Sequence, residues 1–299
     1  PALLCHSCGW NAQCPHCDSR LTVHLRQRAL VCHHCDHRRP LARRCDSCGS
    51  DTLTTVGEGT QQTEEWLAQR FPAVPVMRID RDSTRRQGAF EKLYAQVDAS
   101  DAALLIGTQM LAKGHHFPKV TLAVIVDADS GLFAADFRAH ERFAQLMLQV
   151  AGRSGRGALA GRVVVQSHQP DHPLLEAIAG GDYCAIGNSL LSQRQLGDMP
   201  PYRHLAVVRA EAARADHAEA LLGELRRSCE PYRSAQLELL GPLPASQEKR
   251  ADRYRYILQI SAVERSALHP LLAHCAALAA QLPVARFCRW TIDVDPLEL

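Results

Sequence analysis

The chain has 299 residues, more than one domain of ordinary size, which favours two or three compact units. Its 34 lysines and arginines nearly balance its 32 aspartates and glutamates, which excludes a uniformly basic coat for nucleic acid and leaves only local basic patches. The sequence contains no run of about 18 apolar residues, and its start lacks the order of a signal peptide. We therefore expect a soluble, cytoplasmic protein with no membrane association.

Eight of the twelve cysteines form four Cys-x-x-Cys pairs between Cys5 and Cys48. Two thiolates two residues apart fit adjacent vertices of a tetrahedron, so each pair supplies half of a closed, structural zinc site. Several pairs are followed by glycine or aspartate, which tolerate the tight turn that such a pair requires. The pattern predicts a module over residues 1–53 that binds two Zn²⁺ ions.

The loops between the pairs indicate which pairs share a metal. The residues between Cys17 and Cys32 alternate with period two, which predicts a hairpin that brings the inner pairs together. We assign one zinc to the inner pairs, Cys14, Cys17, Cys32 and Cys35. We assign the other zinc to the outer pairs, Cys5, Cys8, Cys45 and Cys48. Pairing the first two motifs and the last two motifs in sequence order is the alternative.

Other interpretations of this segment are weaker. A redox centre needs one Cys-x-x-Cys pair at the start of a helix rather than four regularly spaced pairs. The arginines of the segment face either DNA phosphates or solvent: Arg26, Arg28, Arg38, Arg39, Arg43 and Arg44. The isolated cysteines stand among apolar residues, and we interpret them as buried core residues: Cys184, Cys229, Cys275 and Cys288.

From residue 54 the pattern changes to short apolar runs separated by amphipathic stretches, which is typical of a parallel α/β domain. We expect strands at residues 54–57, 76–79, 103–106, 122–127 and 162–166. We expect helices at residues 60–71, 87–97 and 137–152. The domain should end near residue 198, with its functional loops at the carboxyl ends of the strands.

Three of these loops carry polar sequences. Residues 107–118 read GTQMLAKGHHFP, residues 127–129 are acidic at both ends, and residues 149–157 read QVAGRSGRG. Two arginines between glycines suit a phosphate, because guanidinium groups make bidentate, charge-assisted hydrogen bonds and glycines allow close backbone approach. Taken alone, the last loop is equally consistent with a solvated turn.

The first and third loops resemble motifs V and VI of superfamily 2 helicases. Four cysteine pairs upstream, RIDRDST at residues 78–84, and the stretch from Val126 to Arg156 extend the likeness over nearly the whole chain. The chain resembles the PriA family of bacterial replication-restart helicases. That resemblance implies an α/β fold in which a RecA-like second helicase lobe carries an inserted two-zinc module, and it also favours the nested pairing of cysteines.

The resemblance further implies a role in ATP hydrolysis. Arg153 and Arg156 match the catalytic arginines that reach the ATP phosphates across the cleft between two lobes, as arginine fingers. Gln149 matches the polar residue that couples the nucleotide side to the DNA side. The GxxxxGK[ST] loop and the acidic magnesium-binding motif are absent from the sequence, and in the family they lie on an upstream lobe. We expect the C-terminal part of a longer, ATP- and Mg²⁺-dependent enzyme that is inactive by itself.

Motif V implies contacts with DNA. Thr108 and Gln109 match residues that hold the phosphates of one strand, and Lys113 is a weaker candidate for the same surface. The sequence departs from many superfamily 2 helicases at His116, where they carry an aspartate that contacts the nucleotide ribose. The ribose contact is therefore in doubt.

The last hundred residues, 199–299, follow a boundary with two prolines and show the order strand, helix, strand, strand, helix, strand. This βαββαβ order predicts a small α+β domain of ferredoxin-like type. Four basic residues beside two tyrosines are candidates to bind DNA, with a solvated hairpin edge as the alternative: Lys249, Arg250, Arg253 and Arg255.

The resemblance as a whole implies part of an ATP-dependent 3′–5′ DNA helicase that recognises stalled forks and starts primosome assembly for replication restart. Its partners would be forked and single-stranded DNA, single-stranded DNA-binding protein and other restart primosome proteins, in the bacterial cytoplasm at the nucleoid. A non-catalytic zinc-ribbon module that binds nucleic acid and a zinc-dependent redox switch are the alternatives.

Overall fold

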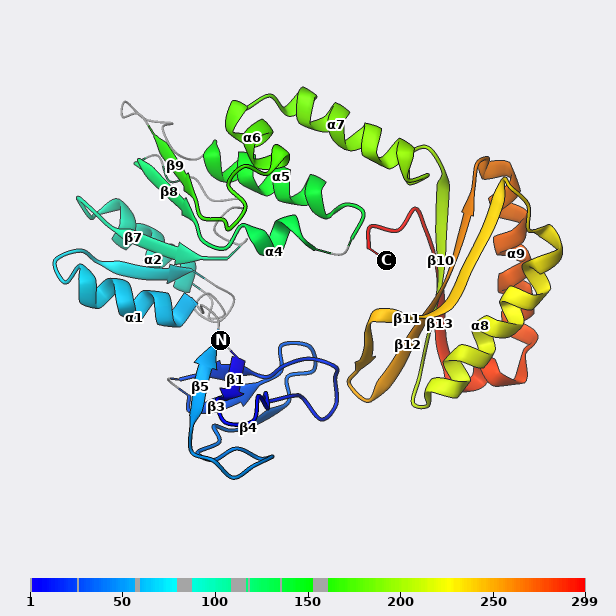
Figure 1. Cartoon of the computed structure of the whole chain (residues 1–299), viewed down its shortest axis with the longest axis horizontal. Helices are drawn as coiled ribbons and strands as arrows, with labels where there is room; N and C mark the ends of the chain where they lie inside the picture. Colours follow the sequence, from blue (N-terminus) through cyan, green and yellow to red (C-terminus); the bar gives the residue numbers. More distant parts are fainter. Residues whose placement is uncertain are drawn as a thin grey trace. The chain divides into compact units, whose positions relative to one another are not determined.

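The computed structural model of the chain describes residues 2–25, 27–56, 60–79, 88–108, 117, 119–134, 136–152 and 161–298 (Figure 1). It contains two compact units, of which one joins Pro1–Gly57 to Ser192–Leu299 and the other is Glu58–Leu191. The finer division after residues 53 and 198 stays a prediction. In the parts of the chain that the structure describes, no helix has the length and apolar character to cross a membrane.

The cysteine-rich segment, residues 2–56, is built on an antiparallel sheet in the order β4-β3-β2-β1-β5. Its strands are β1 (Ala2–Cys5), β2 (Thr22–His24), β3 (Ala29–Val31), β4 (Arg38–Pro40) and β5 (Leu53–Val56). Strands β2 and β3 form the hairpin expected between the inner cysteine pairs, with Val23 opposite Leu30. Few large side chains, among them Leu3 and Leu21, fill the core. A core this small needs a further staple such as a metal.

The strand expected at residues 54–57 joins the cysteine-rich sheet rather than the parallel strands that follow it. It forms β5, which runs antiparallel to β1 with Leu4 opposite Thr54. Thr54 and Thr55 make this strand partly polar, which suits an antiparallel strand with one face in water better than a parallel strand buried on both faces. The α/β region therefore begins after β5.

The middle of the chain combines helices with parallel strand pairs, as the sequence predicts. Strand β6 (Val76–Ile79) pairs with β7 (Leu104–Gly107), and β8 (Leu122–Ile125) pairs with β9 (Arg162–Val165). The helices are α1 (Thr60–Arg70), α2 (Ala89–Asp98), α4 (Asp129–Leu132), α5 (Ala139–Ala151), α6 (Pro173–Gly180) and α7 (Tyr183–Leu196). Among the described residues these strands form two separate pairs, so a RecA-like lobe stays a proposal.

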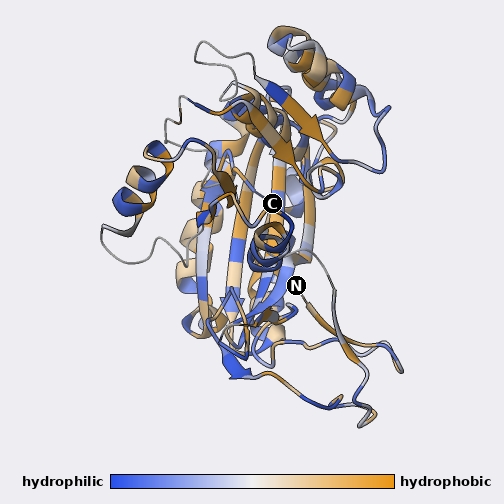
Figure 2. Cartoon of the chain, turned by 90° about the vertical axis from the view of Figure 1, so that its left-hand side faces the viewer, coloured by the Kyte–Doolittle hydropathy of each residue, from blue (hydrophilic) through white to orange (hydrophobic). Residues whose placement is uncertain are grey.

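The core of this middle unit lies among its last helices. Leu132 of α4, Phe143 of α5 and Ile186 of α7 are buried together. The strand pair β8–β9, coloured orange in Figure 2, is less well covered, with Leu122 54% and Val124 55% exposed. Parallel strands are usually buried on both faces, so this pair leaves apolar surface that an isolated domain would bury.

The last hundred residues form the βαββαβ order that the sequence predicts. The elements are β10 (His204–Ala212), α8 (Ala215–Cys229), β11 (Leu237–Arg250), β12 (Arg253–Ala262), α9 (Arg265–Gln281) and β13 (Cys288–Val294). The sheet has the antiparallel order β11-β12-β10-β13, and α8 and α9 cover one face of it (Figure 1). Leu225, Leu258 and Leu268 lie in the core between helices and sheet. Pro283–Phe287 form a short 3₁₀ helix directly before β13.

The isolated cysteines do not share one environment. Cys229 and Cys275 are buried between α8 and α9, as interpreted, and Cys288 is half-buried. The interpretation is wrong for Cys184, which is exposed in the first turn of α7. Residues two apart on a helix point in different directions, and the buried residue of this helix is Ile186.

Candidate metal centres and nucleic-acid residues

The eight paired cysteines form two groups of four. In each group the sulfur atoms all lie within 4.8 Å of one another. The outer cluster contains Cys5, Cys8, Cys45 and Cys48, and the inner cluster contains Cys14, Cys17, Cys32 and Cys35. The structure thus brings together the nested pairs rather than the pairs in sequence order.

The spacing of the sulfur atoms fits zinc. A tetrahedral ion with Zn–S bonds of about 2.3 Å requires sulfur atoms about 3.8 Å apart. The observed distances are 3.7 Å between Cys5 and Cys48 and 3.6 Å between Cys14 and Cys35. Four thiol ligands without an open position are typical of a structural site. Both clusters therefore fit a structural Zn²⁺ ion.

The four Cys-x-x-Cys turns, or knuckles, share one backbone pattern. In each, the N–H of the first cysteine donates to the carbonyl five residues later, as from Cys5 to Trp10. In three knuckles the residue after the second cysteine donates back to the carbonyl of the first cysteine; these residues are Gly9, Asp36 and Gly49. Their φ angles are 74°, 59° and 73°, in the left-handed region that glycine and aspartate tolerate. This requirement explains why those residue types follow the pairs.

The thiols of a cluster differ in their readiness to ionise. Burial opposes ionisation of Cys5 and Cys32, but backbone amides and neighbouring polar side chains lower the pKa of each to about 6. Burial, together with the thiols of Cys35 and Cys32, raises the pKa of Cys17 to about 12. Because zinc binds thiolates, an incoming ion has to displace protons from the less acidic members.

Most of the arginines that the structure describes in the cysteine-rich segment are exposed, and Arg26 lies outside the described residues. Arg39 is held by Asp46, with 2.6 Å between Nη1 and Oδ2. Four of the arginines expected to face phosphates or solvent are described and exposed: Arg28, Arg38, Arg43 and Arg44. A phosphate-binding role for them stays a prediction.

Two of the four basic residues expected to bind DNA in the last domain contact the cysteine-rich segment. The Lys249 Nζ donates to the Pro15 carbonyl at 3.2 Å, and the Arg250 Nε donates to the His34 carbonyl at 3.3 Å. Arg253 is exposed and Arg255 is half-buried, opposite Glu211 in the sheet. Binding of DNA by these four residues stays a prediction.

Two family models match the chain. Residues 14–40 match the PriA DNA helicase Cys-rich region domain, and residues 195–297 match the primosomal protein N C-terminal domain. Over all 299 residues the chain is 44% identical to the replication restart protein PriA of Haemophilus influenzae. The chain is therefore similar to PriA proteins over its whole length.

Two further PriA proteins match the chain at lower identity. The replication restart protein PriA of Bacillus subtilis is 37% identical over 274 residues, which cover 90% of this chain and 34% of that protein. The PriA of Synechocystis sp. is 36% identical over 306 residues, which cover 99% of this chain and 35% of that protein. The chain spans 41% of the Haemophilus influenzae protein. It therefore corresponds to about two fifths or less of these relatives.

The PriA Cys-rich match coincides with one of the two clusters. Residues 14–40 contain the whole inner cluster and the β2–β3 hairpin, while the outer cluster lies on both sides of that range. The outer cluster is formed across the sheet, where β1 and β5 bring the two ends of the cysteine-rich segment together.

The helicase-motif residues of the PriA resemblance are only partly within the described structure. Thr108 lies directly after β7, Gln149 lies in the last turn of α5, and both are exposed. The remaining candidates lie outside the described residues: Gln109, Lys113, Arg153, Arg156 and the departing residue His116. Their roles stay predictions.

One of the acidic residues after β8 has partners that the sequence did not indicate. The Asp129 carboxylate accepts a hydrogen bond from the Ser167 hydroxyl at 2.5 Å and one from the His168 amide at 2.9 Å. The Ser167 bond first, and the His168 amide second, hold the pKa of Asp129 below its usual value. These bonds tie the segment after β8 to the segment after β9.

Proposed function

We propose that the chain is the C-terminal part of an ATP-dependent 3′–5′ DNA helicase that recognises stalled replication forks and starts primosome assembly for replication restart. The observation that carries the proposal is the 44% identity to a replication restart protein over all 299 residues. The two four-cysteine clusters that fit zinc support it. The proposed location is the bacterial cytoplasm, at the nucleoid.

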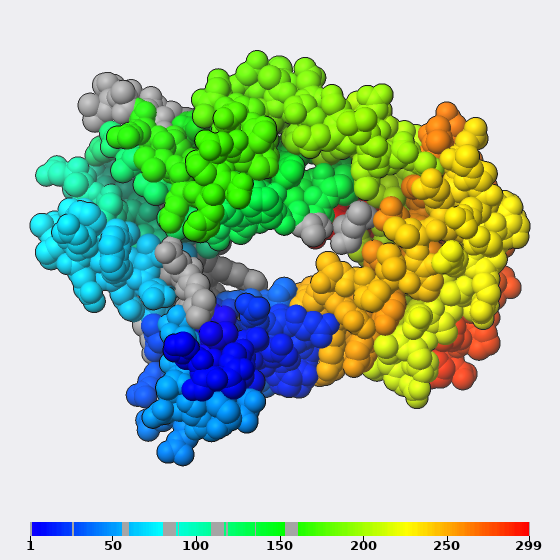
Figure 3. Space-filling view, in the orientation of Figure 1, coloured from blue at the N-terminus to red at the C-terminus, as the bar shows by residue number. Residues whose placement is uncertain are grey.

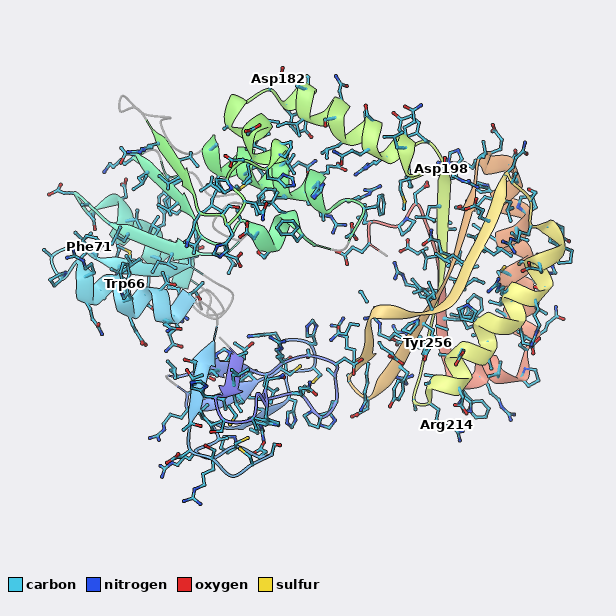
Figure 4. The ribbon with its side chains drawn as sticks, viewed as in Figure 1. Trp66, Phe71, Asp182, Asp198, Arg214 and Tyr256 are labelled. Carbon is cyan, nitrogen blue, oxygen red and sulfur yellow. The ribbon has the colours of Figure 1, made fainter. Side chains whose placement is uncertain are left out.

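The middle of the chain, up to residue 198, is assigned to the second RecA-like lobe, between a zinc module at residues 1–53 and a C-terminal domain at residues 199–299. The parallel pairs β6–β7 and β8–β9 support this assignment. So does the exposed apolar surface of β8, because a strand of a larger parallel sheet would be covered on both faces. Trp66 and Phe71, which are labelled in Figure 4, are also exposed, by 60% and 43%.

In the proposed enzyme, ATP and Mg²⁺ bind between this lobe and an upstream lobe that carries the phosphate-binding loop. Arg153 and Arg156 stabilise the charge on the transferred phosphoryl group, and Gln149 couples the nucleotide to DNA. Guanidinium groups suit this role because they form bidentate bonds with phosphate oxygens.

The proposed DNA contacts come from two regions. Thr108, Gln109 and Lys113 hold the phosphates of one strand through motif V. Arg253 and Arg255 of β12 add a basic surface on the last domain. Forked DNA, single-stranded DNA-binding protein and other restart primosome proteins are the proposed partners.

Zinc has a structural role in the proposal. The eight cysteines hold two Zn²⁺ ions, which fix a segment whose own apolar core is small. A rigid segment of this kind can guide or separate DNA strands while the lobes move with ATP hydrolysis.

The test is ATP hydrolysis by the full-length protein. Arg153→Ala and Arg156→Ala should each lower the DNA-stimulated rate strongly, since arginine fingers contribute roughly 10³ to 10⁵ in related nucleotide hydrolases. Arg162→Ala changes an exposed arginine of β9 and serves as the matched control, with a rate close to that of the unchanged protein.

The outcome also separates the proposal from its rivals. Full DNA-stimulated hydrolysis in Arg153→Ala would favour a non-catalytic zinc-ribbon module that only binds nucleic acid. A protein purified without zinc, whose cysteine pairs oxidise readily and reversibly, would favour a redox switch.

A further inference from the structure

The tip of the β11–β12 hairpin lies against the inner cluster. Strand β11 ends at Arg250 and β12 begins at Arg253, so Ala251 and Asp252 form a two-residue turn. We call residues 249–252 the hairpin tip. Figure 3 shows this part of the chain, in orange, against the blue cysteine-rich segment of the same compact unit.

Backbone hydrogen bonds join the hairpin tip to the first knuckle of the inner cluster. The Asp18 amide donates to the Lys249 carbonyl at 3.0 Å, whereas the equivalent amides of the other three knuckles close their own turns. The Lys249 amide returns a bond to the Asp18 carboxylate at 2.5 Å. The Asp252 amide donates to the His16 carbonyl at 2.9 Å. The first inner knuckle is therefore completed by a segment from the other end of the sequence.

Side chains extend the same contact to the second knuckle. His16 Nδ1 lies 2.6 Å from the Asp252 carboxylate, and Lys249 Nζ binds the Pro15 carbonyl. Arg250 reaches across to the His34 carbonyl, which lies between the two cysteines of the second inner knuckle. Both halves of the inner cluster are thus held by one hairpin.

The closest contact is with a metal ligand itself. The amide of Ala251 donates to the sulfur of Cys17 at 3.2 Å, although the two residues are 234 positions apart in the sequence. Cys17 is 3% exposed, so this bond lies in a region of low dielectric. An N–H group that points at a thiolate stabilises its negative charge, as second-sphere donors do in metal sites generally.

The conformation of the tip indicates that the contact shapes the hairpin. Ala251 and Asp252 have φ angles of 50° and 58°, as in a type I′ turn. Such turns favour asparagine and glycine, and alanine is poorly suited to a positive φ. The sequence Ala251-Asp252 therefore does not favour a type I′ turn by itself. The hydrogen bonds to the inner cluster offset the unfavourable backbone conformation.

We propose that the hairpin tip is a positioning element of the inner zinc site, and that zinc in this site fixes the last domain to the cysteine-rich segment. In this arrangement the Ala251 amide donates to the zinc-bound thiolate of Cys17. The two inner knuckles fix the conformation of the hairpin tip. Loss of zinc from the inner cluster would loosen both knuckles and release the hairpin.

The outer cluster has a different environment. Its knuckles are linked by a network of hydroxyl groups, with 3.0 Å between the oxygens of Ser7 and Ser50 and 2.6 Å between those of Ser7 and Thr52. Two of its cysteines, Cys8 and Cys48, are exposed, whereas three of the four inner cysteines are buried. The two zinc ions therefore have separate tasks: the outer ion closes the cysteine-rich segment, and the inner ion also joins it to the last domain.

The first test measures zinc release from the full-length protein by a chromogenic chelator. Two double variants assign the release phases to the clusters. The inner cluster is removed by Cys32→Ser with Cys35→Ser, and the outer cluster by Cys45→Ser with Cys48→Ser. Ala251→Pro removes the amide donor and the positive φ, and should speed release from the inner cluster at least about tenfold, as loss of a second-sphere partner does elsewhere. Ala251→Gly retains the amide and suits the turn, so it should leave both phases unchanged.

Two outcomes would overturn the proposal. One is inner release that is equally slow in Ala251→Pro and Ala251→Gly. The other is equal acceleration of both phases, which would indicate general destabilisation instead of a local role at the inner site.

A second measurement does not depend on the Ala251→Pro variant folding. The hairpin tip carries two trypsin sites, Lys249 and Arg250, and a third site, Arg253, directly follows it. Brief digestion of the protein lacking the inner pair Cys32 and Cys35 should cut at these sites at least about tenfold faster than digestion of the protein lacking the outer pair Cys45 and Cys48. Mass spectrometry identifies the cuts. Equal protection of the tip in both variants would contradict the proposal.

The inference requires zinc in the clusters but not helicase activity. Zinc release and tip cleavage are read without ATP or DNA, so a failure of the proposed function would leave both measurements interpretable. Conversely, normal ATP hydrolysis with an unprotected tip in the zinc-loaded protein would refute only the role of the hairpin.

Discussion

At the scale of single residues, hydrogen bonds over long sequence separations decide the chemistry of several side chains. Asp129 lies directly after β8 in sequence, but its partners Ser167 and His168 follow β9. Cys17 lies in a knuckle that the sequence predicts, but one of its donors is Ala251. A motif thus identifies the residue, while its electrostatic environment depends on which distant segment folds against it.

The lowered pKa of Asp129 predicts that its contribution to the stability of the fold decreases in acid. Its pKa in the folded chain is lowered, so its bonds stabilise the fold above the unfolded carboxyl pKa of about 3.9 and are lost as pH falls through the folded-state value. Asp129→Asn should therefore lower stability at neutral pH, and the difference from the unchanged protein should shrink in acid. Urea unfolding at a series of pH values checks this. A difference that grows in acid would contradict it.

At the scale of elements, the strands and helices that the sequence pattern predicts in the last domain are those that pack together in its fold. Periodicity predicts each strand and helix, and α8 and α9 bury their leucines against the sheet. Strand β11 departs from regular pairing between Leu240 and Leu243. Gly241 lies at that irregularity with a φ of 118°, and a Cβ there would lie 2.6 Å from the Ile257 carbonyl.

Two glycines of this domain should respond oppositely to alanine. Gly223 lies inside α8 with open space around its missing Cβ, so Gly223→Ala should stabilise the domain by about 0.5–1 kcal/mol through helix propensity. Gly241→Ala should destabilise it by about 1–3 kcal/mol, because the backbone must shift to relieve the clash. Denaturant unfolding measures both. Stabilisation by Gly241→Ala would show that the close approach to β12 is not rigid.

At the scale of the whole molecule, the segments differ in what stabilises them. The last domain has an extensive apolar core, whereas the cysteine-rich segment has a small one completed by thiols. The middle unit buries side chains of its last helices but leaves apolar strand surface exposed. Removal of metal should therefore affect the segments unequally.

Chelation supplies the corresponding prediction. The purified protein should contain about two zinc ions per chain, and their removal should unfold the cysteine-rich segment, because binding and folding of such small sites are coupled. The α8–α9 domain should keep its helices, apart from the released hairpin tip. Zinc analysis with hydrogen exchange by segment checks both statements. Unchanged protection of residues 2–25 after chelation would exclude a structural role for the metal.

The sequence alone determined the features that depend on local spacing: the four Cys-x-x-Cys knuckles, the β2–β3 hairpin between the inner pairs, and the βαββαβ order. Each leaves a repeat or an alternation that can be read along the chain. Tertiary structure alone decided that β5 joins β1, that Cys184 faces water, and that the hairpin tip binds the inner cluster. These outcomes depend on contacts between residues far apart in sequence, and such contacts leave no periodic signal at either partner.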